Sequence, residues 1–231
     1  MEKGSSGNWK RKHAEEIFGD LLNSGDAEKL AKVAILAPRN KEALEINNEV
    51  LDKMPGTPRL YTSLDEISDK DGKPVVSDDM HCTTEFSNRM TPSGMPPQEL
   101  RLKKGVIIML LRNLDVKNSM CNGTRFVVEA MGDRVLQCKF VSGARQGQMV
   151  LIPRIKLNYE KNLPFVMSRL QFPIRLPFAK TVNKSQGQTI EKIGLHPNEP
   201  IFSHSQPVVR GFFQNDIQGR CEGLCTVRND Q

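Results

Sequence analysis

The first regular pattern of apolar residues is a strand, a turn and a helix between residues 33 and 54. Residues 33–37 are apolar without interruption, which is typical of a buried strand. Pro38 and Arg39 break this run, and Asn40 is a suitable N-cap for a following helix. Apolar residues then recur at helical spacing until a Pro-Gly pair ends the pattern: Ala43, Ile46, Val50 and Met54. Strand, tight turn and helix together are the unit from which α/β sheets are built, so the pattern predicts an α/β fold.

A different pattern occupies residues 106–155, after a polar stretch (57–98) that is rich in Asp, Pro, Ser and Gly and is predicted to be irregular. Four short strand-like runs are separated by Asn122-Gly123, Gly132-Asp133 and the segment 143–147. Asn-Gly and Gly-Asp pairs between such runs indicate hairpins. The pattern predicts a small antiparallel barrel or sheet made of these runs: Val106–Leu111, Arg125–Met131, Val135–Val141 and Met149–Ile155.

Composition excludes several classes of protein. Hydrophobic residues make up 38% of the 231 residues, which is too many for a wholly disordered chain. The longest apolar run, Val106–Leu111, is much shorter than the ~18–20 residues that a membrane span needs. The polar first residues lack the apolar core of a secretory signal. We therefore expect an intracellular protein without a membrane partner.

The formal net charge of +6 is unevenly distributed along the chain. Residues 1–93 carry 13 basic and 17 acidic side chains, and residues 191–231 carry 4 and 5. Residues 94–190 carry 16 basic and only 5 acidic side chains, a net charge of +11. A regional excess of this kind is typical of a surface that binds a polyanion, and it also occurs on soluble basic faces that bind nothing.

Cysteine and histidine give little indication of a metal site. The five cysteines include no Cys-x-x-Cys pair, and Cys221 and Cys225 stand four apart without a matching pair. The four histidines show no ligand spacing. Reduced, scattered thiols in an intracellular protein are the better interpretation, and we expect no metal.

The segment Thr181–Thr189 carries the most distinctive chemistry in the chain. Hydroxyls, amides and one lysine are concentrated in nine residues that follow an apolar stretch. Such groups bind phosphate oxygens, and Gly187 would let the backbone approach a ligand closely. The alternative is a solvated turn with a helix cap. The residues concerned are Thr181, Asn183, Lys184, Ser185, Gln186, Gly187, Gln188 and Thr189.

Three blocks of sequence together resemble the Pif/RecD-type ATP-dependent DNA helicases of superfamily one, especially those of nematodes and Helitron transposons. The blocks are AILAPRNKEALEINNEVL (34–51), TPSGMPPQELRLKKGVIIMLLRNLDVKNSMCNGTRFVV (91–128) and RLQFPIRLPFAKTVNKSQGQT (169–189), the last continuing to PIFSHSQ (200–206). The likeness extends over residues ~33–206 in the order and spacing of the family. It covers the C-terminal portion of such a helicase.

The resemblance implies a partial second RecA-like domain with an inserted small antiparallel β-barrel of the Src-homology-three type. Residues 1–32, which precede the likeness, are predicted from their own pattern to be a polar lead-in with a helix over 13–23, since Ile17, Leu21 and Leu22 lie on one side of it. Residues 33–98 and 166–206 would form the RecA-like domain, 99–165 the barrel insert and 207–231 a divergent tail. By the same resemblance, segments matching the fourth and fifth helicase motifs and two arginines of the insert would bind single-stranded DNA: Pro38, Arg39, Asn40, Thr181–Thr189, Arg112 and Arg125.

The sequence also departs from the family. No G-x-x-x-x-G-K-[ST] loop occurs, so ATP and magnesium are implied by the family alone. Asp65-Glu66 follows a polar stretch and is a poor magnesium candidate. Counting from Gln206, Phe213 stands where the sixth motif would place its arginine. We therefore expect a truncated or frame-altered copy in which the first motor domain is missing.

Three functions are consistent with the sequence. The chain is part of a nuclear or mitochondrial DNA helicase acting in repair, recombination or telomere maintenance, with a P-loop supplied by a fuller product or a partner. Alternatively, it is a non-catalytic nucleic-acid-binding module, or an inactive transposon-derived remnant. In either alternative the chain by itself has no ATP hydrolase activity.

Overall fold

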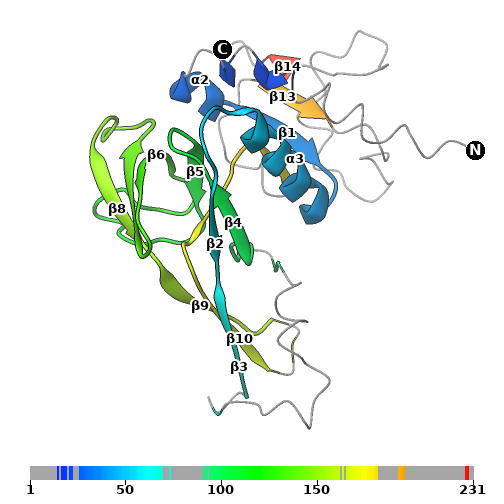
Figure 1. Cartoon of the computed structure of the whole chain (residues 1–231), viewed down its shortest axis with the longest axis vertical. Coiled ribbons are helices and arrows are strands. Elements are labelled where there is room, and N and C mark those ends of the chain that lie inside the picture. Colours follow the sequence, from blue (N-terminus) through cyan, green and yellow to red (C-terminus); the bar gives the residue numbers. More distant parts are fainter. Residues whose placement is uncertain are drawn as a thin grey trace, which may run out of the picture. The chain divides into compact units, whose positions relative to one another are not determined.

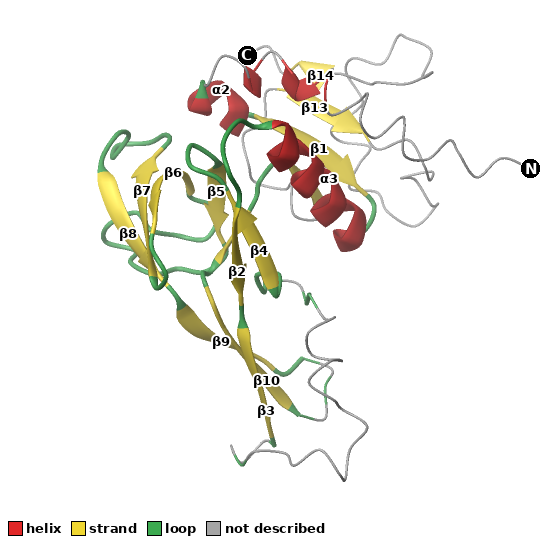
Figure 2. Cartoon of the chain, in the orientation of Figure 1, coloured by secondary structure: helices red, strands yellow, loops and turns green. Residues whose placement is uncertain are grey.

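The chain forms two compact units. In the computed structural model the described residues are 15, 17–19, 21–22, 26–69, 73, 91–92, 94–161, 163, 165–181, 192–195 and 227–228. One unit combines Met1–Met54 with Pro177–Gln231, and the other is Pro55–Leu176. We call them the α/β unit and the β unit (Figure 1). Among the described residues, the helices belong to the α/β unit, while the β unit consists of strands and loops (Figure 2). The predicted α/β class is therefore confirmed.

A mainly parallel sheet lies at the centre of the α/β unit. Its central strand β1 (Val33–Ala37) runs parallel to β12 (Ala179–Thr181) on one side and to β13 (Lys192–Leu195) on the other. β14 (Val227–Arg228) extends the sheet antiparallel to β13. Every residue of β1 is buried, as expected of a strand that is covered on both faces. The uninterrupted apolar run predicted this strand correctly.

Helices pack against this sheet. α2 (Ala27–Ala31) begins at the N-cap Asp26, whose carboxylate accepts a hydrogen bond from the backbone N–H of Lys29 at 3.1 Å. α3 (Asn40–Lys53) contacts β1 and β12 through its buried face, which is Ala43, Ile46, Asn47, Val50 and Leu51. Among the helices that the structure describes, none is long and apolar enough to cross a bilayer.

The helix predicted over residues 13–23 is present at each of its described positions, which are 15, 17–19 and 21–22. Ile17 and Phe18 are buried. The ring of Phe18 contacts that of Phe178 edge-on, with 5.6 Å between their centroids. A Cβ atom on Gly194 would lie 2.1 Å from Cδ1 of Ile17, so β13 approaches this helix closely and a larger residue would require the end of the Ile17 side chain to move.

The β unit contains a five-stranded antiparallel sheet in the order β11-β5-β6-β7-β8. Inward-facing residues alternate with outward-facing ones along β7, and the buried set includes Leu136, Cys138 and Phe140. The strands are β5 (Ile107–Leu110), β6 (Arg125–Met131), β7 (Val135–Phe140), β8 (Met149–Pro153) and β11 (Ile174–Arg175). The strands predicted over residues 106–155 are confirmed, except that the last run is divided at Arg154.

Two smaller antiparallel sheets complete the β unit. One has the order β3-β10-β9 and the other pairs β2 with β4. β2 continues into β3 through Ser63, and β8 into β9 through Arg154, so single residues link the sheets. The pairings of the described residues form no closed barrel, and that part of the prediction is not confirmed. The bounds are β2 (Arg59–Thr62), β3 (Leu64–Ser68), β4 (Glu99–Leu102), β9 (Ile155–Tyr159) and β10 (Val166–Gln171).

The prediction that residues 57–98 are irregular is wrong for β2 and β3. These strands pair with β4 and β10, which lie far along the chain. Their stability depends on these distant partners, and their local sequence has no clear alternation. Arg59 reinforces the position of β2, since its guanidinium donates to the carbonyl of Met131 at 2.5 Å and pairs with Asp133.

Cys138 provides a test of packing in the β unit. It is fully buried, and burial, followed by the nearby charge of Glu129, raises the pKa of its thiol to about 12. The thiolate is the reactive form, so we expect no alkylation of Cys138 in the folded protein at neutral pH and rapid alkylation in urea. Peptide mass spectrometry measures this, with the half-buried loop residue Cys121 as the comparison. Equal labelling rates for the two thiols in the folded chain would contradict the expectation.

Candidate nucleic-acid interface

Two of the predicted binding segments leave the α/β sheet at the same edge. β1 and β12 are parallel and pair Ala37 with Thr181 at their carboxyl ends. Pro38–Asn40 follow β1 directly, and Thr181 is the last residue of β12. The carboxyl ends of parallel strands are the usual position of ligand sites in open α/β sheets. The structure therefore brings the Pro38–Asn40 segment and Thr181 together, although they are far apart in sequence.

The start of α3 differs from the prediction in one detail. Arg39, with φ −125° and ψ 154°, is the N-cap, and Asn40 is the first helical residue. The N-cap makes no side-chain hydrogen bond to the helix, whereas its carbonyl accepts the N–H of Ala43 at 3.1 Å. The helix therefore begins one residue earlier than predicted, and Asn40 is its first residue instead of its N-cap. Arg39 and Asn40 are both exposed at the N-terminal end of α3, where the helix dipole favours an anion.

Asn47 joins α3 to β12 beside this edge. Its Oδ1 accepts the N–H of Ala179 at 2.9 Å, and its Nδ2 donates to the carbonyl of the same residue at 2.9 Å. The Nδ2 group also donates to the carbonyl of Ala43 at 2.8 Å. Asn47 thus satisfies both backbone groups of one residue of the edge strand, as a neighbouring strand would. This contact fixes β12, and with it the point from which Thr181 emerges.

The two predicted arginines belong to the β unit. Arg112 is exposed and lies two residues beyond the end of β5. Arg125 is the first residue of β6 and is half-buried, and burial lowers the pKa of its guanidinium. Backbone hydrogen bonds hold the loop between them, including that from the N–H of Gly123 to the carbonyl of Leu110 at the end of β5, at 2.9 Å. Gly123 has a φ of +92°, which only glycine adopts readily, so it acts as a turn former.

The remaining predicted residues lie outside the described part of the chain. They are Asn183, Lys184, Ser185, Gln186, Gly187, Gln188 and Thr189.

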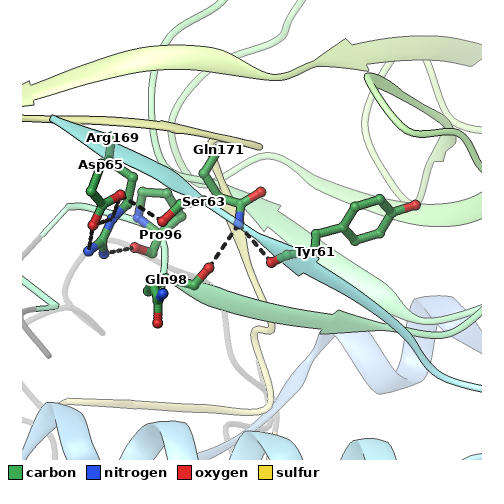
Figure 3. A network of polar contacts seen from close by, with 7 residues as sticks. All are labelled: Tyr61, Ser63, Asp65, Pro96, Gln98, Arg169 and Gln171. Carbon is green, nitrogen blue, oxygen red and sulfur yellow. Dashed lines mark hydrogen bonds and ion pairs between the residues drawn. The ribbon is translucent and has the colours of Figure 1, made fainter. Parts of the chain in front are cut away.

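A buried polar cluster in the β unit was not predicted (Figure 3). Arg169 of β10 and Asp65 of β3 form an ion pair whose side chains are 0% and 1% exposed. Nε of Arg169 lies 2.9 Å from Oδ1 and 3.1 Å from Oδ2 of Asp65, and Nη2 lies 2.5 Å from Oδ2. Ser63 adds a hydrogen bond to the same carboxylate at 2.6 Å. Every oxygen of the carboxylate therefore has a partner.

The cluster connects β2, β3 and β10 with the segment that precedes β4. Nη1 of Arg169 donates to the carbonyl of Pro96 at 3.0 Å. Gln171 donates to the carbonyls of Tyr61 at 2.9 Å and Gln98 at 3.2 Å. The sequence contained one signal of this cluster, since Arg169 stands between the apolar residues Met167 and Phe172, both of which are buried in the structure. A charged residue in such a stretch requires a partner, but the sequence does not identify it.

Both carboxylates of the Asp65-Glu66 pair are engaged in ion pairs. Asp65 of the Asp65-Glu66 pair is occupied by Arg169, and Glu66 pairs with Lys156 at 2.6 Å. Where the structure describes the chain, it contains no group of three or more His, Cys, Asp or Glu residues that could hold a metal ion.

Comparison with known proteins identifies a family for part of the chain. The family described as "DNA helicase Pif1, 2B domain" matches residues 85–131, which include β4, β5, β6 and the loop between β5 and β6. The chain is 31% identical over 212 residues to an ATP-dependent DNA helicase PIF1 of Xenopus laevis, covering 89% of this chain and 30% of that protein. A protein of the same name from Danio rerio is 30% identical over 188 residues, which are 78% of this chain and 26% of the relative.

The fold is also similar to a solved structure. The crystal structure of Pif1 helicase from Candida albicans matches with a TM-score of 0.52 at 21% identity. The match covers 80% of this chain and 48% of that one. At this level of identity the likeness concerns the fold.

Proposed function

We propose that the chain, which spans 30% or less of the length of the frog and fish relatives, belongs to the Pif1-type helicases and supplies the DNA-contacting part of such a helicase. Its ligand is single-stranded DNA. The binding surface in the α/β unit consists of the Pro38–Asn40 segment together with Thr181–Thr189. Arg112 and Arg125 bind DNA phosphates from the β unit.

One observation carries this proposal, namely the pairing of Ala37 with Thr181 at the carboxyl edge of the sheet. It places the N-terminal end of α3 and Thr181, the first residue of the predicted phosphate-binding segment, at the same edge of the sheet. Hydroxyl, amide and N–H groups of this kind bind phosphate oxygens without reading the base sequence. With 16 basic and 5 acidic side chains, residues 94–190 supply the charge that a polyanion requires.

We also assign each unit, the ATP hydrolysis and the cellular role to parts of the whole helicase. The α/β unit corresponds to the second RecA-like domain, and residues 99–165 to a barrel insert of the Src-homology-three type. ATP hydrolysis with magnesium, and a role in DNA repair, recombination or telomere maintenance in the nucleus or mitochondria, belong to a product that also contains the first motor domain. The parallel sheet with α3, interrupted by an all-β segment, supports this division.

We expect the purified chain to bind single-stranded DNA with an affinity that falls as salt rises. Each phosphate neutralised contributes a slope of about −0.7 to log K against log salt. Replacing Lys184 by glutamine removes one such contact, so the slope should become shallower by about 0.7 and the affinity should fall. Anisotropy titrations of a fluorescent oligothymidine at several salt concentrations measure both quantities.

Lys29→Gln is the matched control, since this lysine is 70% exposed on α2 and pairs with Asp26. It removes the same charge away from the proposed surface. Binding that is independent of salt, or identical effects of the two substitutions, would contradict the proposal. DNA-stimulated ATP hydrolysis by the chain alone would contradict the assignment of the ATP site to another part of the helicase.

A further inference from the structure

The last strand of the five-stranded sheet has an open edge (Figure 1). β8 pairs with β7 on one side, and among the residues that the structure describes no strand pairs with its other side. At one end of this ladder the N–H of Phe140 donates to the carbonyl of Gln148 at 3.1 Å. At the other end the N–H of Arg154 donates to the carbonyl of Arg134, also at 3.1 Å. Gln148 and Arg154 therefore point their backbone groups toward β7.

The backbone groups of Met149 and Leu151 point to the open edge. In an antiparallel ladder the direction of the N–H and carbonyl groups alternates from one residue to the next. Because Gln148 and Arg154 face β7, the residues at odd positions between them face away from it. Met149 and Leu151 each offer an N–H and a carbonyl there, whereas Pro153 offers a carbonyl alone. The edge is thus a template for one more strand.

Apolar side chains border this edge. Met149 and Leu151 are 49% and 63% exposed, and Val135, which pairs with Pro153 from β7, is 38% exposed. The strand itself, Met149–Pro153, contains no charged residue. Proteins usually protect a free edge with charged residues, a bulge, a proline or a covering element, and β8 has a proline at its last position alone. An apolar edge with so little protection indicates a surface that another strand covers.

The end of β8 is basic. Residues 134–154 include four basic side chains and no acidic one. Two of them, Arg134 and Arg154, lie at the same end of the hairpin, where their backbones are hydrogen-bonded to each other. The guanidinium of Arg154 donates to two neutral oxygens, a backbone carbonyl and a side-chain amide, which leave its charge in place. The neighbouring Asp133 is itself paired with Arg59. An acidic group at this end of an added strand would therefore be attracted.

From this edge we infer that β8 binds an extended, acidic segment of a partner protein as an additional strand. Main-chain hydrogen bonds to Met149 and Leu151 hold the segment, and the side chains of these two residues contact its apolar positions. The acidic residues of the segment lie beside Arg134 and Arg154. This is a surface for a protein partner and is independent of the proposed binding of DNA.

Two other occupants fit the edge less well. A second copy of this chain would bring the same four basic residues of 134–154 and no acidic one, so charge disfavours pairing of two such hairpins. DNA would match the arginines, but it has no row of donors and acceptors at the spacing of a β-strand and no use for the exposed side chains of Met149 and Leu151.

The test of strand addition uses a short fluorescent peptide in which valine alternates with threonine and glutamates stand at both ends. Anisotropy titrations with the full chain should show binding that weakens as salt rises and is lost when lysines replace the glutamates. Methylation of alternate backbone nitrogens of the peptide gives two patterns. One pattern blocks the N–H groups that face β8 and should abolish binding, whereas the other should leave it nearly unchanged. Equal effects of the two patterns would overturn the proposal.

A pair of variants tests the place of binding. Leu151→Glu should weaken binding of the peptide several-fold, because it removes an apolar contact and repels the glutamates. Leu64→Glu is the matched control, since this leucine is 64% exposed on β3, which belongs to another sheet. Protection of Cys138 from alkylation verifies that each variant is folded.

The remaining outcomes decide between the occupants. If the chain does not bind the peptide, or if both variants weaken binding equally, the proposal is overturned. A concentration-dependent dimer in sedimentation that Leu151→Glu dissociates and the peptide does not would assign the edge to a second copy and overturn the acidic partner. Affinity for oligothymidine that falls in Leu151→Glu while peptide binding is unchanged would assign the edge to DNA.

Discussion

Replacing Asp65 by alanine should lower the free energy of unfolding of the β unit by about 3–5 kcal/mol, because it leaves the guanidinium of Arg169 buried without its counter-ion. The pair is 0% and 1% exposed, so water cannot replace the lost carboxylate. Urea unfolding followed by far-ultraviolet circular dichroism measures the change. The alkylation of Cys138 at each urea concentration, read by mass spectrometry, reports on the β unit specifically.

Two further variants test the cause of this loss. Glu66→Ala removes the next residue of β3 from its ion pair with Lys156, whose side chains are 69% and 56% exposed, and should cost less than about 1 kcal/mol. Combining Asp65→Leu with Arg169→Met removes both charges and should recover much of the stability lost in Asp65→Ala, since buried pairs are often replaceable by apolar residues. A double variant as unstable as Asp65→Ala would show that packing, and not an uncompensated charge, explains the loss.

Local sequence predicted the elements whose stability is visible in their own residues. The apolar run 33–37 is buried on both faces of the sheet, so its composition alone indicates a strand. Arg125–Met131 was predicted with its observed bounds. β2 and β3 were missed because their stability comes from pairing with β4 and β10 and from the Asp65–Arg169 contact, which involves residues 104 positions apart.

The same distinction applies to the candidate site. The sequence identified Pro38–Asn40 and Thr181 as separate motifs, and the parallel pairing of β1 with β12 explains why they share an edge. The open edge of β8 was not identified, because a short apolar run looks the same in the sequence whether its strand lies inside a sheet or at its end. The position of β8 is visible only through the strand order β11-β5-β6-β7-β8. The sequence thus shows which residues have suitable chemistry, whereas only the fold shows which of them lie close together.

The position of Thr181 depends on Asn47, whose side-chain amide forms hydrogen bonds with both backbone groups of Ala179, as a neighbouring strand would. The Nδ2 group donates to two carbonyl oxygens, and Oδ1 accepts one N–H. Asn47→Ala leaves the buried N–H and carbonyl of Ala179 without partners, at a cost of about 1–3 kcal/mol for each. We expect lower stability of the α/β unit and faster hydrogen exchange of the Ile35 amide, which donates to the carbonyl of Phe178 in the neighbouring strand.

Asn47→Asp should make this loss dependent on pH. The introduced carboxylate would be buried opposite the carbonyls of Ala43 and Ala179, so its pKa in the folded state should lie above the ordinary value of about 3.9. A raised folded pKa means that the stability is fully present below the unfolded pKa and is lost as pH rises through the folded pKa. Relative to the unmodified chain, the variant should therefore be least destabilised near about pH 4 and most destabilised at neutral pH. Asn48→Asp, a half-buried neighbour on the same helix, is the control, and an equal pH dependence in both variants by urea unfolding would contradict the role of Asn47.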